Sequence, residues 1–95
     1  MKWMEFIKVQ TVQSNVAAEL ANFIAECRNC HGLLETKIFD HVTVDDCSIC
    51  LHWNTNQPES QGSAIGLSLC NTFKKYGLVD HSIWVERREK EEEKS

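Results

Sequence analysis

The chain has 95 residues, of which 42% are hydrophobic and 25% are charged, and its net charge is −4. This length predicts one domain, and the composition is typical of a globular protein in water. No apolar run is long enough to span a membrane, and no basic stripe is present to follow nucleic acid or an anionic lipid surface. Since the first residues also lack the apolar stretch of a signal peptide, we expect a cytoplasmic protein.

The first third of the chain predicts a strand followed by a helix. Residues 5–11 alternate, with Ile7 and Val9 on one face. Ser14 or Asn15 is a suitable N-terminal cap, and an apolar stripe at helical spacing then continues to Cys27. Gly32 is expected to adopt a left-handed conformation after the helix.

The rest of the chain is expected to hold two strands, a polar loop, a second helix and a last strand, over residues 33–42, 47–53, 54–62, 65–76 and 79–87. Gly77 is expected to end the second helix, with Leu78 making the apolar contact of a Schellman cap. We therefore assign residues 1–87 to a single α+β domain and residues 88–95 to a charged C-terminal tail.

The element order β-α-β-β-α-β predicts a ferredoxin-like fold, with four antiparallel strands and both helices on one face of the sheet. The face that meets the helices should carry three apolar pairs: Ile7 and Val9, Ile49 and Leu51, Ile83 and Val85. The opposite face should carry a mixed set: Phe6, Lys8, Gln10, Cys50, His52, Trp84 and Glu86, with Lys37 and Phe39 from the second strand. A second copy of the same sheet is the simplest cover for such a face, so we expect a homodimer.

Local features at the ends of these elements carry a family resemblance. A glycine leads from the first helix into the second strand, in Cys30-His31-Gly32-Leu33-Leu34-Glu35, and the third strand ends on a tryptophan and a polar loop, in Cys47-Ser48-Ile49-Cys50-Leu51-His52-Trp53-Asn54-Thr55. Over about residues 4–87 the chain resembles the dimeric α+β barrel superfamily, and within it the antibiotic-biosynthesis-monooxygenase-like proteins.

The resemblance implies two chains packed sheet against sheet, with the helices outside and a cavity between each sheet and its helices or the partner. It also implies small-molecule chemistry, because members oxidise aromatic compounds with O₂ without a metal or flavin, or degrade haem. Trp53 is the position that best matches the family pattern. The chain departs from the haem-degrading members, since Lys8 and Gln10 stand where an asparagine is expected, and it lacks the histidine-rich second helix of many members.

The candidate site on the covered face centres on His52, as a base or hydrogen-bond donor, with Trp84 stacking on a phenolic or carbonyl ligand. Cys50, Phe6, Lys8 and Trp53 complete the expected pocket. The function predicted is small-molecule binding without a cofactor, extending to a cofactor-independent monooxygenase. The alternative is a non-catalytic dimeric interaction domain, in which His52 is only an interface histidine.

The five cysteines offer a different alternative. Two Cys-x-x-Cys pairs, Cys27 with Cys30 and Cys47 with Cys50, have spacing suited to a tetrahedral zinc site. The second pair lies in an alternating strand, where positions three apart point to opposite faces, which argues against a shared metal. The first pair also matches a c-type haem attachment pattern, but haem attachment requires export. A thioredoxin-like role is discounted because that pair closes its helix at the C-terminal end, where the dipole does not stabilise a thiolate.

Overall fold

The computed structural model describes residues 1–11, 16–27, 29–44 and 46–87. In chain order, its elements are β1 (Lys2–Thr11), α1 (Val16–Cys27), β2 (Leu33–Asp40), β3 (Cys47–Asn54), α2 (Ala64–Phe73), a 3₁₀ turn η1 (Lys74–Tyr76) and β4 (Gly77–Val85). The predicted cap at Ser14 or Asn15 and the predicted tail over 88–95 lie outside the described residues. The predicted order of elements is confirmed.

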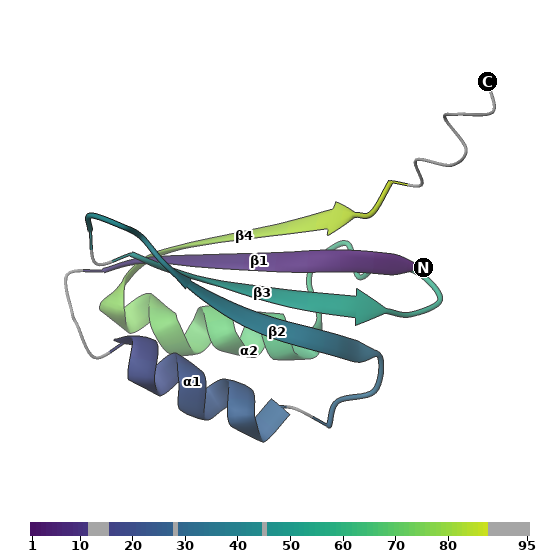
Figure 1. The fold of residues 1–95 in the computed structure, drawn as a ribbon, viewed down its shortest axis with the longest axis horizontal. Coiled ribbons are helices and arrows are strands. Elements are labelled where there is room, and N and C mark those ends of the chain that lie inside the picture. Colours follow the sequence, from purple (N-terminus) through teal and green to yellow (C-terminus); the bar gives the residue numbers. More distant parts are fainter. Residues whose placement is uncertain (12–15, 28, 45, 88–95) are drawn as a thin grey trace.

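The four strands form one antiparallel sheet in the order β2-β3-β1-β4. Both helices lie on the same face of this sheet, below it in Figure 1, and leave the other face bare. The predicted ferredoxin-like α+β arrangement is therefore confirmed. Within the described residues, no helix is both long and apolar enough to cross a membrane. The cytoplasmic location stays a prediction.

Apolar side chains of the two central strands fill the space between sheet and helices. Ile7 and Val9 of β1 and Ile49 and Leu51 of β3 are fully buried, as the alternation predicted. On the edge strand β4, Ile83 packs against this core, whereas Val85 at the strand end is half exposed. Helix α1 contributes Leu20 and Ile24, and α2 contributes Leu69 and Phe73, because each places apolar residues at helical spacing on one side.

The two glycines expected at helix ends behave differently. Gly32 has a φ of 86°, as predicted, and its carbonyl accepts a hydrogen bond from the Asn54 N–H at 2.8 Å. Gly77 instead has a φ of 162° and a ψ of −158°, which is extended backbone. The Schellman cap prediction is wrong here, because the 3₁₀ turn tightens the end of α2 and Gly77 already pairs with Thr11 in the sheet. Leu78 is accordingly 72% exposed.

Candidate functional site

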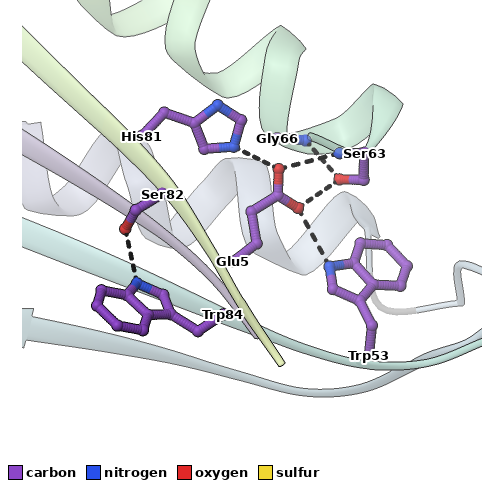
Figure 2. Close-up of polar contacts among 7 residues, drawn as sticks. All are labelled: Glu5, Trp53, Ser63, Gly66, His81, Ser82 and Trp84. Atoms are coloured by element: carbon purple, nitrogen blue, oxygen red, sulfur yellow. Dashed lines mark hydrogen bonds and ion pairs between the residues drawn. The ribbon is translucent and has the colours of Figure 1, made fainter. Parts of the chain in front are cut away.

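The helix-facing side of β1 carries a carboxylate among apolar side chains. Glu5 lies two residues before Ile7 on this face and is fully buried. Its Oε1 accepts hydrogen bonds from the Trp53 Nε1 at 3.2 Å and from the Ser63 Oγ at 2.6 Å. Its Oε2 accepts one from the Ser63 N at 3.0 Å and lies 2.6 Å from the His81 Nε2 (Figure 2). A buried carboxylate is costly unless such partners replace water, so these contacts hold Glu5 in the core.

Ser63 connects this carboxylate to the start of α2. Its backbone is extended, with φ −69° and ψ 162°, and its Oγ accepts a hydrogen bond from the Gly66 N at 2.9 Å. A hydroxyl has one proton, so Ser63 donates to Glu5 while it accepts from Gly66. The positive end of the helix dipole also faces the carboxylate. The N-terminus of α2 is therefore occupied by the chain's own carboxylate, rather than left open to a ligand.

Two glycines make room for these groups. A Cβ added to Gly66 would overlap the carboxylate of Glu5, and one added to Gly62 would overlap the imidazole of His81. Gly62 also has a φ of 104°, in the region that favours glycine. The segment from Gly62 to Gly66 thus fits closely around the acid and the histidine.

His81 is a residue that sequence analysis missed as a site residue, as are Glu5 and Ser63. Its side chain is 18% exposed and points from β4 toward the helices, opposite Ile7 in the strand register. A signal was present in the sequence. Glu5 has the same parity as Ile7 and Val9, so the alternation already placed a carboxylate on the buried face. We call Glu5, Trp53, Ser63 and His81 the acid network.

A pocket of about 350 Å³ opens beside the acid network. Trp3 and Trp53 line its buried side, and their rings stack with centroids 5.6 Å apart and planes at 16°. The Trp3 Nε1 donates to the Thr55 Oγ1 at 2.8 Å, and the Trp53 Nε1 donates to Glu5, so both indoles are held in place. The full lining comprises Trp3, Cys30, His31, Trp53, Thr55, Glu59, Ser63, Ala64 and Ile65.

A second, more polar pocket of about 420 Å³ adjoins the first. The two share His31, Thr55 and Glu59. The second is completed by residues of the chain start, the end of β3 and the loop after it: Met1, Asn54, Asn56 and Gln57. We call the first the aromatic pocket and the second the polar pocket; the two lie next to each other.

The bare face of the sheet carries the other predicted site residues. His52 and Trp84 both pair with Met4 in the register, so they lie on either side of the central strand β1. Neighbouring strands are about 4.8 Å apart, which separates the two backbones by about 10 Å. Phe6 pairs with Cys50, and Lys8 lies further along β1 on the same face.

The surroundings of these side chains differ strongly. Trp84 is 59% exposed, and its Nε1 donates to the Ser82 Oγ at 2.9 Å (Figure 2). The Nε2 of His52 is covered, yet it has no hydrogen-bond partner among the residues that the structure describes; Glu86 Oε1 lies 3.7 Å away. Cys50 is buried, and burial raises the pKa of its thiol. Five of the predicted site residues therefore share the bare face, whereas Trp53 lines the pocket on the opposite face.

The cysteines divide into a neighbouring pair and a separated pair. Cys27 and Cys30 are neighbours at the end of α1, where burial and then the Cys30 sulfur raise the pKa of the Cys27 thiol. Cys47 packs in the core and its Sγ donates to Asp40 Oδ1 at 3.4 Å, whereas Cys50 lies on the bare face. In the part of the chain that the structure describes, no three His, Cys, Asp or Glu side chains come together as metal ligands. The four cysteines do not form the zinc site that their spacing suggested, because β3 points its pair to opposite faces.

Comparison with solved structures identifies the architecture. The Mycobacterium tuberculosis protein Rv0793 superposes with a TM-score of 0.72 at 12% sequence identity, covering 93% of this chain and 97% of that one. A mutant of SnoaB, a cofactor-independent oxygenase from Streptomyces nogalater, superposes with a TM-score of 0.68 at 11% identity, covering 92% and 94%. The chain therefore shares the ferredoxin-like α+β fold of these two proteins over more than nine-tenths of its length. No sequence-family model matches the chain, and no curated protein matches its sequence.

The same topology also occurs within a larger enzyme. A formyltetrahydrofolate deformylase from Pseudomonas putida KT2440 matches with a TM-score of 0.51 at 14% identity, over 90% of this chain but 29% of its own. A ferredoxin-like fold hosts many unrelated functions. The activity must therefore be argued from this chain's own pockets and faces.

Proposed function

We propose that this protein is a homodimer that binds a flat, largely apolar aromatic compound in the pocket beside Trp3 and Trp53. The observation that carries the proposal is the stacked pair of indoles forming one wall of that pocket. Aromatic rings bind flat ligands through offset stacking, which adds about 0.5–1.5 kcal/mol to the burial of apolar area. Ligand sites are typically apolar concavities with a few polar groups that fix orientation.

The polar groups of this pocket favour a ligand with a hydroxyl or carbonyl group at one end. The Ser63 hydroxyl is already engaged by Glu5 and Gly66, and the Thr55 hydroxyl accepts from Trp3 and donates to the Gln57 carbonyl. The exposed side chains of His31 and Glu59 stand where the aromatic and polar pockets meet. A phenolic or carbonyl compound would place its ring beside the indoles and its oxygen toward His31 and Glu59.

Dimerisation through the bare sheet face is the second part of the proposal. That face exposes 50% of Phe39 and 59% of Trp84 beside the buried Cys50. A partner sheet would remove these rings from water and leave both pockets open on the outside. It would also cover His52, whose Nε2 lacks a hydrogen-bond partner among the residues that the structure describes.

That unsatisfied atom favours a second candidate, in which the ligand binds at the dimer face and His52 is the catalytic base. Oxidation by O₂ without a cofactor requires the substrate itself to supply the electrons, and removing its proton makes it electron-rich. A histidine within hydrogen-bond reach of a phenol or ketone suits that step. Phe6, Lys8, Cys50 and Trp84 would surround the substrate, and the likeness to SnoaB supports this oxygenase chemistry.

Titration with 1-naphthol, followed by the indole N–H resonances in two-dimensional NMR, tests the proposal. Binding in the aromatic pocket should shift the signals of Trp3 and Trp53 and leave that of Trp84 in place. Ala64→Trp, which fills the pocket from the exposed start of α2, should weaken binding, whereas Leu67→Trp on the same helix should not. Shifts confined to Trp84 and abolished by His52→Ala would instead support the dimer-face site.

Two further results, one from that titration and one from oxygen uptake, decide the class of protein. If no indole signal moves and every variant behaves alike, the binding proposal fails and the interaction-domain alternative is favoured. O₂ uptake by a series of bicyclic and tricyclic phenols, measured with an oxygen electrode, tests the oxygenase step. Uptake that His52→Ala abolishes would establish it, and binding without uptake would leave a non-catalytic binding protein.

A further inference from the structure

One chemical feature of the aromatic pocket is not used by the proposed ligand. Cys30 lines that pocket, and its neighbour Cys27 lies at the end of α1. Both thiols are free and half-buried. The Cys30 N–H donates to the Cys27 carbonyl at 3.1 Å, which brings the two residues close together. The pocket wall therefore contains one thiol, that of Cys30, with a second thiol close behind it at Cys27.

We propose that Cys27 and Cys30 form a reversible disulfide with small-molecule disulfides as the oxidant, and that this bond reshapes the aromatic pocket. The reshaping of the aromatic pocket rests on the proposed binding function, whereas formation of the disulfide does not. One thiolate attacks the small disulfide, forms a mixed disulfide and releases one small thiol. The second thiolate then attacks the protein sulfur of that mixed disulfide and releases the other small thiol. In sum, two protein thiols are oxidised, and the small disulfide takes up both electrons and both protons.

The local geometry suits such a bond and gives it a structural consequence. The Cys30 N–H donates to the Cys27 carbonyl at 3.1 Å, and in such a four-residue turn the first and last Cα atoms are less than about 7 Å apart. A disulfide requires a Cα separation of about 4.4–6.8 Å, which such a turn can provide. Forming the bond joins the two sulfurs at about 2 Å and therefore fixes the Cys30 side chain against the end of α1. Because Cys30 is part of the wall, the bond changes the space beside the indoles of Trp3 and Trp53.

The electrostatic surroundings support a stable disulfide rather than a fast oxidoreductase. Burial, the Cys30 sulfur and the nearby Glu26 raise the pKa of the Cys27 thiol. In strongly oxidising dithiols, a stabilised thiolate favours the reduced form, and here that stabilisation is missing at Cys27. The same placement at a helix C-terminus that argues against a thioredoxin-like catalyst thus favours persistence of the bond once it forms.

The remaining thiols serve as internal controls. Cys47, Cys50 and Cys70 are each at least nine-tenths buried, so oxidant in water reaches them poorly. Burial also raises the pKa of the thiols of Cys50 and Cys70, which further slows their attack on a disulfide. Selective oxidation should therefore be confined to the pair beside the pocket.

Equilibration of the folded protein with glutathione disulfide and glutathione, read by intact-mass spectrometry and peptide mapping, tests the inference. We expect the wild type to lose the mass of two hydrogen atoms, with the new bond joining Cys27 to Cys30. Cys27→Ser and Cys30→Ser should each retain one bound glutathione, because no resolving thiol remains. Mixed disulfides on the wild type without ring closure, or closure between other cysteines, would overturn the proposal.

The consequence for the pocket has its own readout. Oxidation should shift the indole N–H resonances of Trp3 and Trp53, while Trp84 on the bare face serves as an unmoved reference; 1-naphthol should then bind several-fold more weakly. Unmoved Trp3 and Trp53 signals in the oxidised protein would overturn the reshaping. Absence of 1-naphthol binding to the reduced protein would count against the proposed function instead, since the mass and the resonance shifts do not depend on a ligand.

Discussion

The Nε2 of His81 lies 2.6 Å from the Oε2 of Glu5, a carboxylate that is fully buried between sheet and helices. The two residues are on neighbouring strands but two residues apart in register, since Glu5 pairs with Ile83 and His81 pairs with Ile7. Their contact joins β1 to β4, and Ser63 extends it to the start of α2. The acid network therefore positions Trp53 and α2, the two sides of the aromatic pocket.

Glu5→Gln should destabilise the fold by about 3 kcal/mol, because it leaves donors of Trp53, Ser63 and His81 imperfectly matched in a buried site. Urea unfolding followed by circular dichroism measures the change. Glu35→Gln is the matched control, since Glu35 forms an exposed pair with Lys37 at 3.6 Å and should change stability by less than about 1 kcal/mol. Equal effects of the two substitutions would contradict the structural role of Glu5.

Gly66→Ala should destabilise the protein by about 1–3 kcal/mol, because the added methyl group would overlap the Glu5 carboxylate. Helix propensity alone predicts the opposite sign, with alanine better than glycine by about 1 kcal/mol. The sign of the change in unfolding free energy therefore separates close packing from propensity. Ser68→Ala, at an exposed position of the same helix, should be neutral or slightly stabilising.

Trp84→Glu should shift the proposed dimer toward monomer without unfolding the chain, because it places a charge on the bare sheet face. Sedimentation velocity over a range of concentrations measures the distribution. Leu67→Glu is the control, since Leu67 is 46% exposed on α2, in the layer of helices. A monomeric wild type, or loss of the dimer in the control alone, would refute the assignment of this face.

The stability of the protein should fall as the pH rises past the ordinary tyrosine range. The Tyr76 hydroxyl donates to the Glu19 carboxylate, and this hydrogen bond, then partial burial and the Glu19 charge, raise the pKa of Tyr76. A pKa that is higher in the folded state means that the contribution is complete below about pH 10 and is lost as pH rises through the folded value. Unfolding free energies at about pH 9 and about pH 11 should therefore differ more for the wild type than for Tyr76→Phe. Identical differences would show that Tyr76 does not contribute.

A strong chelator should leave the unfolding temperature unchanged, because Cys47 and Cys50 lie on opposite faces of β3. Thermal unfolding with and without EDTA, together with elemental analysis of the purified protein, measures this. Bound zinc whose removal lowers the unfolding temperature would contradict the arrangement of the four cysteines seen here.

Most of the fold could be predicted from the sequence, because hydrophobic periodicity is a local property. Alternation in residues 5–11 and 47–53, and apolar stripes at helical spacing, placed every strand and helix within a few residues. The same alternation correctly put Phe6, Cys50, His52 and Trp84 on one face. It also argued correctly that Cys47 and Cys50 point apart, although their spacing alone suggested a metal site.

What the sequence by itself determined is therefore the order of elements and the face on which each strand residue lies. Only the tertiary structure decided which distant groups come together. Glu5 contacts His81 and Ser63, and Cys30 lines the same pocket as Trp3 and Trp53. The physical reason is that periodicity encodes the direction of a side chain within its own element. Contacts across elements depend on strand order, register and the angle at which a helix crosses the sheet, and these are set by packing of the whole core.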